Sequence, residues 1–236
     1  MLPNPLNMHH ASNKAGNYAT EAYSAEQPQV KVLAHASVVV YYKDMAIYVD
    51  PHTSYADYTH FRPADLILIT HDHFDHFDQK ALKELAVTRT IVIANITVKK
   101  MLLSLRPDLK VRMLKNDESV NFGPDIVIRA VPAYNIKNIR PETGRPYHSK
   151  GVGNGYIIEF PDTRIYIAGD TEQIPEMADL GEIDIAVLPK MYPFTMDGEM
   201  FIEAARLIKP KILYTYHYDT VDKTLLRQQL PGIEVR

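Results

Sequence analysis

The chain of 236 residues contains no cysteine. This absence excludes disulfides, thiolate nucleophiles and every metal site that uses a cysteine ligand. It does not by itself fix a compartment, because a cytosolic protein can also lack cysteine. Any metal chemistry in this chain therefore depends on histidine and carboxylate side chains.

Three further absences narrow the possible partners. The net charge of −3 leaves no excess of positive charge, so nucleic acid is not an expected partner. No apolar run approaches the length of a membrane span, and residues 1–29 lack the apolar centre of a signal peptide. We therefore expect a cytoplasmic protein without a transmembrane segment, although a signal peptide already removed would leave no trace.

The chain also has no Gly/Ser-rich linker and no sequence repeat between its halves. Its length suits one large domain or two small ones, and the missing linker favours one domain over residues 29–236. Residues 1–28 are polar, with scattered proline, asparagine and alanine. This composition predicts an N-terminal extension that is disordered or lies across the surface.

Both halves of the sequence alternate between predicted strands and helices. Residues 30–42 and 45–50 predict a strand meander, and residues 64–71 are apolar enough for a strand buried on both faces. Asp78 is placed to cap a helix. Further helices are expected at 79–86, 97–105, 199–208 and 223–230, and further strands at 90–95, 125–134, 155–160, 163–170, 183–189 and 211–217. Two sheets with helices on their outer faces would bury these surfaces.

The stretch LILITHDHFDHFD, residues 66–78, places His71, His73, Asp75 and His76 directly after a predicted strand. Imidazole and carboxylate groups together suit zinc and similar divalent ions. A loop after a strand can aim residues two apart at one ion and present the next two to a second ion. The alternative is a polar turn with chance histidines, but three of the ten histidines fall within six positions.

Two metal sites need more ligands than this loop supplies. In open sheets, functional groups gather beyond the carboxyl ends of the strands. Asp50, Asp170 and His217 each end a predicted strand, and His148 lies in a long loop before another. A surface histidine is the alternative reading of His148, because loops often carry polar residues.

The H-x-H-x-D-H pattern after a strand resembles that of the metallo-β-lactamase-fold hydrolases, over about residues 30–236. The resemblance implies an α/β (α+β) fold, a four-layer αββα sandwich, with two divalent metal ions at one edge. Zinc is the first expectation, and manganese and iron are alternatives. The implied ligands are His71, His73 and His148 for the first ion and Asp75, His76 and His217 for the second, with Asp170 bridging them. Asp50 would orient a ligand histidine.

Within this family, the segments AHASVVVYY, AGDT, PFTMDGEMFIEAARLIKP and YHYD resemble the branch of L-ascorbate-6-phosphate lactonase and N-acyl-phosphatidylethanolamine phospholipase D. This resemblance would place His35 near the site, where a satisfied buried histidine is an equal alternative. Without cysteine, the second ion cannot be held as in the commonest zinc β-lactamases. The implied activity is hydrolysis of a lactone or phosphoester, with Asp75 as the proton acceptor and later donor.

Two loops, 52–63 and 134–150, are expected to roof the site. The second carries Lys137, Arg140, Arg145 and Lys150, which could attract an anionic small molecule or could simply be solvated. Tyr134, Tyr192, Phe194 and Thr195 are candidates for the pocket lining, with packing or helix capping as their alternative. A non-catalytic scaffold and an RNA-processing nuclease of the same fold remain alternative functions, and a homo-oligomer is left open.

Overall fold

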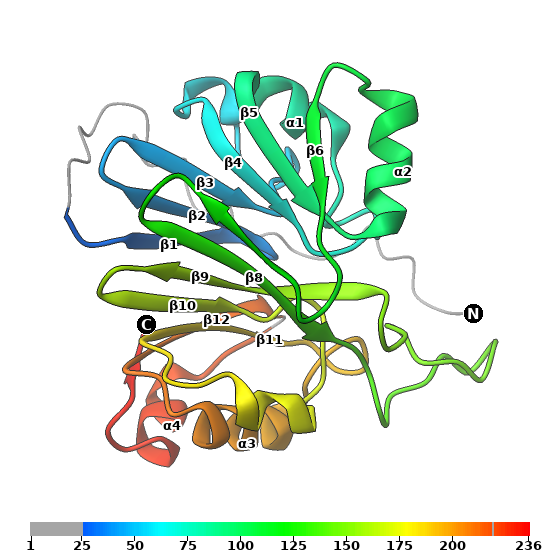
Figure 1. Ribbon diagram of the computed structural model, residues 1–236. Coiled ribbons are helices and arrows are strands. Elements are labelled where there is room, and N and C mark those ends of the chain that lie inside the picture. Colours follow the sequence, from blue (N-terminus) through cyan, green and yellow to red (C-terminus); the bar gives the residue numbers. More distant parts are fainter. Residues whose placement is uncertain (1–25, 219) are drawn as a thin grey trace.

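The computed structural model describes residues 26–218 and 220–236. The extension predicted for residues 1–28 therefore lies outside the described residues, apart from its last three. The described chain forms two β-sheets with helices on their outer faces (Figure 1). None of its helices is both long and apolar enough to span a membrane.

The first sheet has six strands in the order in which they occur in the chain. They are β1 (Gln29–Ala34), β2 (Ser37–Tyr42), β3 (Met45–Val49), β4 (Ala64–Ile69), β5 (Ala86–Ala94) and β6 (Lys110–Met113). The first three pair antiparallel, and β3 to β6 pair parallel. Parallel pairing brings the carboxyl ends of β3 and β4 to the same edge, where Asp50 and His71 follow them.

The second sheet has seven strands in the order β13-β12-β11-β10-β9-β8-β7. They are β7 (Ser119–Phe122), β8 (Ile126–Ala133), β9 (Gly153–Phe160), β10 (Thr163–Ile167), β11 (Ile185–Lys190), β12 (Ile212–Tyr218) and β13 (Glu234–Val235). Strands β7 to β10 pair antiparallel, and β10 to β13 pair parallel. Asp170 follows β10, and His217 lies near the end of β12.

Four α-helices connect the parallel strands, and each begins at a side chain that caps it. They are α1 (Gln79–Leu85), α2 (Ile96–Leu105), α3 (Gly198–Ile208) and α4 (Lys223–Gln229). Their caps are Asp78, Asn95, Asp197 and Asp222, whose oxygens accept backbone N–H groups of the first turn. Short 3₁₀ helices occupy Tyr58–His60 (η2) and Pro175–Asp179 (η3). The predicted cap at Asp78 is confirmed.

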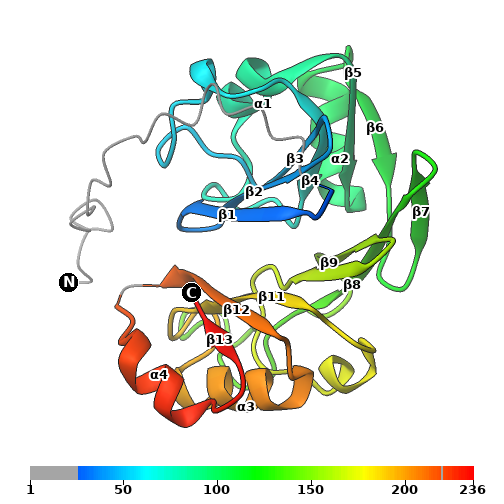
Figure 2. The ribbon, with the colours of Figure 1, turned by 90° about the vertical axis from the view of Figure 1, so that its left-hand side faces the viewer.

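The buried side chains fall into three layers, as an αββα sandwich requires. Along β4, Leu66 and Leu68 point into the layer between the sheets, whereas Ile67 and Ile69 point toward α1 and α2. A third layer packs α3 and α4 against the second sheet, with Phe201 fully buried. Figure 2 shows the two sheets facing each other with their helices on opposite sides. The predicted four-layer architecture is confirmed.

Three short strands escaped the sequence prediction. Strands β6 and β7 have four residues each and alternate between exposed and half-buried side chains, and β13 has only two residues. All three are edge strands: β6 lies at one edge of the first sheet, and β7 and β13 lie at the two edges of the second. Edge strands bury little apolar surface, so their sequences carry little of the pattern that identifies a strand.

Candidate metal centre

The loop after β4 is folded tightly enough to aim alternate residues in one direction. The carbonyl of His73 accepts the backbone N–H groups of His76 and Phe77, each at 3.0 Å. Phe77 is buried beneath the turn, and Asp78 then begins α1. The loop is thus held between a buried strand and a capped helix, which fixes the direction of its side chains.

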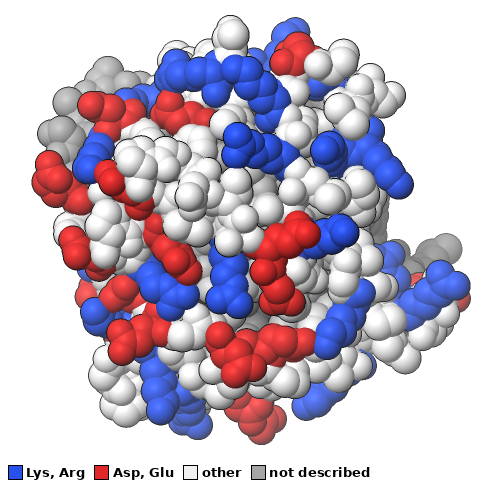
Figure 3. All heavy atoms as spheres, viewed as in Figure 1, with Lys and Arg blue, Asp and Glu red and all other residues white. Residues whose placement is uncertain are grey.

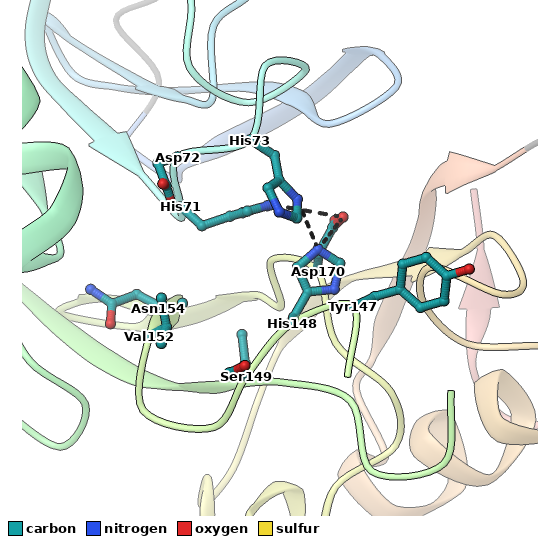
Figure 4. Close-up of a pocket in the computed structure, with 11 residues that line it drawn as sticks. His71, Asp72, His73, Tyr147, His148, Ser149, Val152, Asn154 and Asp170 are labelled. Atoms are coloured by element: carbon teal, nitrogen blue, oxygen red, sulfur yellow. Dashed lines mark hydrogen bonds and ion pairs between the residues drawn. The ribbon is translucent and has the colours of Figure 1, made fainter. Parts of the chain in front are cut away.

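The first ligand group consists of His71, His73 and His148, whose ring nitrogens lie within 4.8 Å of one another. His148 Nε2 lies 3.1 Å from His73 Nδ1. Figure 4 shows the imidazoles of His73 and His148 next to the carboxylate of Asp170. The long loop between β8 and β9 therefore brings His148 to the loop after β4.

Neighbouring groups determine which nitrogen of two of these rings faces the cluster. Asn135 Oδ1 accepts the backbone N–H of His148 at 2.9 Å and lies 2.7 Å from His148 Nδ1. The Nδ1 of His148 therefore carries the proton, and Nε2 presents a lone pair. Thr70 Oγ1 plays the same part for His71, at 3.0 Å from its Nδ1. Such hydrogen bonds orient histidines that bind metals.

The second ligand group consists of Asp75, His76 and His217, together with His35. Asp75 Oδ2 lies 3.5 Å from His217 Nε2 and 3.8 Å from His76 Nε2. His35 Nε2 is 2.9 Å from the same oxygen. His35 is thus near the site, in direct contact with one of its carboxylates.

Asp50 contacts the ring of His76 at the nitrogen that faces away from the cluster. Its carboxylate is fully buried, with Oδ2 2.7 Å from His76 Nδ1. Its other oxygen accepts the backbone N–H of Thr70 at 2.8 Å. His76 therefore carries its proton on Nδ1 and turns Nε2 toward the cluster.

Asp170 lies between the two groups. Its Oδ1 is 3.3 Å from His76 Nε2, and its Oδ2 is 3.4 Å from His148 Nε2 and 3.2 Å from His217 Nε2. The chain reaches this position through Gly169, which has a φ of +68°. A Cβ at Gly169 would lie 2.7 Å from the carbonyl oxygen of Asn154, so only glycine fits here.

The backbone around His217 is bent to aim its ring. The register between β11 and β12 shifts between Pro189 and Lys190, so His217 is the extra residue of a bulge. His217 has a φ of +47°, and its backbone N–H donates to the carbonyl of His35 at 2.7 Å. His35 also has a φ of +47°. A non-glycine residue in this region is strained, and such strain is concentrated at functional sites.

Several inward-facing atoms of this cluster are buried without a hydrogen-bond partner among the described residues. They are the Nε2 atoms of His71, His76 and His217 and the Oδ1 of Asp170. An unsatisfied buried polar atom costs about 1–3 kcal/mol, so such atoms are rare. Nitrogen and oxygen atoms that converge without hydrogen-bonding one another form the kind of ligand set that a divalent cation binds. The residues present therefore fit a metal site.

Burial and neighbouring charge shift the pKa values of these groups in opposite directions. Burial lowers the pKa of His148 to about 4, so its ring is neutral at pH 7. Burial also lowers the pKa of His217, but the carboxylates of Asp170 and Asp75 outweigh it and raise this pKa to about 9. Burial raises the pKa of Asp170, but the rings of His217 and His76 hold it well below its usual value. The cluster thus combines neutral and charged groups in contact.

Five of the residues proposed from the sequence to contact the substrate take different positions. Arg140 Nη2 lies 3.3 Å from His73 Nε2, whereas Arg145 is exposed. The Tyr134 hydroxyl donates to Glu176, and the buried Thr195 hydroxyl lies 2.8 Å from the backbone nitrogen of Met191, whose N–H it accepts. Tyr192 is 65% exposed. Of the five, Arg140 is the one whose contact with a ligand candidate is seen.

A cavity of about 180 Å³ opens beside the first ligand group. His71, His73, His148 and Asp170 form one wall, and the segment from Tyr147 to Asn154 contributes another (Figure 4). This volume is enough for part of a small molecule next to the cluster. The loop 52–63 also reaches the site, since the ring of Tyr55 stacks on His35 with centroids 4.9 Å apart.

Sequence reasoning missed four residues that shape this site: Thr70, Asn135, Tyr147 and Glu172. Thr70 directly precedes His71, so its position in the sequence could have indicated that it contacts the site. The carboxylate of Glu172 accepts the backbone N–H groups of residues 136, 137 and 138. Asn135 and Glu172 lie far in sequence from the residues that they orient, so no local pattern identifies them.

Comparisons with known proteins agree with this architecture. Residues 29–217 match the family model for the Beta-lactamase superfamily domain. A UPF0173 metal-dependent hydrolase of Nanoarchaeum equitans is 32% identical over 81% of this chain and 84% of its own. A solved structure from Parabacteroides distasonis, assigned as a metal-dependent hydrolase, is 43% identical with a TM-score of 0.80, over 89% of this chain and 91% of that one. A metallo hydrolase of Ignicoccus hospitalis shares the fold at 21% identity, with a TM-score of 0.73 over 89% and 94% of the chains.

Proposed function

Because the chain belongs to the beta-lactamase superfamily and is a metal-dependent hydrolase of the metallo-β-lactamase fold, we propose that it uses two metal ions to hydrolyse an ester-type bond in a small molecule. The bond is that of a lactone or a phosphoester. Both reactions need a polarised oxygen and an activated water, so one ligand set serves either. Residues 29–236 act as one domain in this proposal, since both sheets contribute ligands.

One observation carries this proposal. Seven side chains from both sheets converge, and Asp170 touches members of both groups. His71, His73 and His148 would hold the first ion, and Asp75, His76 and His217 the second, with Asp170 between them. Imidazole and carboxylate ligands suit zinc first, and manganese and iron as well.

Two divalent ions in this site would polarise the scissile bond and lower the pKa of a water toward neutrality. The chain itself must then move the proton. Asp75 is better placed for this than Asp170, because its side chain is 17% exposed and that of Asp170 only 3%. With a metal ion bound, Asp75 could accept a proton from the water and return it to the leaving group. His35, in contact with Asp75 Oδ2, holds this carboxylate in place.

Neither alternative function gains support. A scaffold that had lost catalysis would be expected to lack ligands, whereas all seven positions are filled by ligand residues. On the face shown in Figure 3, lysine and arginine side chains are interspersed with aspartate and glutamate. Nucleic-acid binding requires a continuous basic surface, which that face does not offer.

The test is an assay of the zinc-loaded protein on a panel of sugar-phosphate lactones and bis-p-nitrophenyl phosphate. The Asp75→Asn variant should keep its fold and lose most turnover, by about 10²-fold or more. Asp162→Asn, in the exposed turn between β9 and β10, is the matched control and should turn over normally. Wild-type rates in Asp75→Asn would refute its role, and no turnover on any ester by the wild type would refute the proposed reaction.

A further inference from the structure

The loop between β8 and β9 is an ordered hairpin that carries four basic residues. The backbone N–H of Asn135 donates to the carbonyl of His148 at its base, and that of Arg140 donates to the carbonyl of Arg145 near its tip. In Figure 1 the hairpin projects from the right-hand side of the molecule, beyond the sheets. It thus brings Arg140 and His148 to the site on one structural unit.

The four basic residues of this hairpin are not equivalent. Lys150 is neutralised by Glu176, whose Oε1 lies 2.6 Å from its Nζ. Lys137 and Arg145 are exposed to solvent. Arg140 is half-buried, and no carboxylate of the described residues forms an ion pair with it. A guanidinium carries a permanent charge, so Arg140 brings an uncompensated positive charge to the edge of the ligand cluster.

Tyr147 and Phe194 hold the Arg140 side chain in place. Its Nη2 donates to the carbonyl of Tyr147 at 3.1 Å, and the guanidinium lies 5.4 Å from the centre of the Tyr147 ring. The Tyr147 ring in turn packs edge-on against Phe194, with centroids 5.0 Å apart. Tyr147 and His73 both line the cavity, so the guanidinium of Arg140 is held against two residues of the cavity lining.

The contact between Arg140 and His73 depends on which nitrogen of His73 carries its proton. His73 Nδ1 faces His148 Nε2 at 3.1 Å and is therefore the atom that would bind an ion. A neutral ring that binds through Nδ1 carries its proton on Nε2. Two donors would then face each other over 3.3 Å, so Nη2 of Arg140 would lose its acceptor on His73. An anionic oxygen entering the cavity would supply the missing acceptor.

We propose that Arg140, held by Tyr147, forms a subsite for an anionic substituent of the substrate, a carboxylate or a phosphate next to the bond that is cleaved. This inference rests on the proposed function and names its substrate class. The planar fork of arginine suits both anions, because it can donate two parallel hydrogen bonds. Phosphate and carboxylate differ in charge and shape, so binding of matched probes separates the two sources.

Equilibrium binding to the zinc-loaded protein tests the subsite without requiring turnover. Phenylphosphonate, benzoate and neutral benzamide are titrated by calorimetry into the wild type, Arg140→Gln and Arg145→Gln. Arg145→Gln is the matched control, since it removes the same charge from the same hairpin. We expect Arg140→Gln to weaken binding of the preferred anion by about tenfold or more. Arg145→Gln should change it by no more than about twofold, and benzamide should respond to neither variant.

Three results with the variants would overturn the subsite, and one result with the wild type would do so as well. They are an unchanged affinity in Arg140→Gln, equal weakening in both variants, and loss of zinc from Arg140→Gln, which would make Arg140 a support for His73. Weak binding of both anions by the wild type would do the same. Arg140→Lys keeps the charge without the fork and should bind with intermediate affinity, which guards against a folding defect in Arg140→Gln. If no ester were hydrolysed, the proposed reaction would fail while these affinities would still decide the subsite.

Discussion

His217 shows how much one residue contributes to the proposed second site. Its backbone is strained, its ring is buried, and its Nε2 lies within 3.2 Å of Asp170 and 3.5 Å of Asp75. Burial disfavours its charged form, but the two carboxylates outweigh burial and raise its pKa to about 9. Without a metal ion the proton on His217 therefore balances part of the carboxylate charge. A metal ion bound to the neutral ring would balance the same carboxylate charge in place of that proton.

Zinc binding should consequently release a proton from His217 at pH 7. The ring is protonated below a pKa of about 9 and must be neutral to bind, so apparent affinity should rise as pH increases toward 9 and level off above it. Calorimetry in buffers of different ionisation enthalpy measures the proton count. His148, with a pKa of about 4, should release none at pH 7. An equal count in wild type and His217→Gln would contradict this assignment.

At the level of the element, the hairpin after β8 is held by the carboxylate of Glu172. This buried side chain accepts the backbone N–H groups of Ile136 and Lys137 at 2.8 Å and of Asn138 at 2.6 Å. The Asn135 side chain lies 3.3 Å from the same carboxylate and also bonds His148. Glu172, two residues after Asp170, thus links the second sheet to His148, a proposed metal ligand.

Glu172→Gln should therefore loosen the hairpin, because the amide offers one oxygen where the carboxylate offers two. Loss of hydrogen bonds to a charged group costs about 1.5–3 kcal/mol. Hydrogen exchange of the peptide spanning 134–150 should accelerate, and zinc affinity should fall about tenfold as His148 loses its support. Glu159→Gln, which removes a half-exposed partner of Arg164, is the control. Unchanged exchange in Glu172→Gln would show that the hairpin is held by other contacts.

At the scale of the whole molecule, the candidate metal centre connects the two halves of the sandwich. His71 and His76 belong to the first sheet and its loop, whereas Asp170 and His217 belong to the second. The middle layer of apolar side chains already joins the sheets over their inner faces. Metal ions bound at one edge would add a second link between the two sheets, which successive parts of the chain form.

Removal of the metal should accordingly lower the melting temperature. An ion present at about a thousandfold its Kd stabilises the fold by about 4 kcal/mol, which for a chain of this size is about 10 °C. Circular dichroism melts with and without a chelator measure this shift, and added zinc should restore it. His148→Ala should show a smaller response to the chelator. A melting temperature insensitive to chelation in the wild type would contradict the linkage.

The sequence predicted the layers and indicated which histidine and aspartate side chains come together, but it did not indicate the groups that orient them. His71, His73, Asp75 and His76 lie within six positions, and five apolar or β-branched residues, 66–70, precede them. The sequence alone therefore indicated both the position and the chemistry of this loop. Asp50, Asp170 and His217 were found because strand ends share an edge in parallel sheets. Asn135 and Glu172 act on residues that only the folded chain brings to them. The sequence also pointed to Arg140, but as one of four basic residues in the loop. Only the structure distinguishes Arg140 from the other three, because it shows Lys150 paired with Glu176 and Arg140 held by Tyr147.

The anchoring of the hairpin base by Glu172 has a consequence for how such a protein can diversify. Hydrogen bonds to Glu172 fix the backbone of residues 136–138, on the first half of the hairpin. The hydrogen bond from the backbone N–H of Asn135 to the carbonyl of His148 fixes the second half at the base of the hairpin. Insertions, deletions or charge changes between residues 139 and 146 would then leave His148 in its place beside His73. The tip could therefore vary in length and charge while the proposed metal ligands stay in place, so that related chains could differ in the molecules they bind.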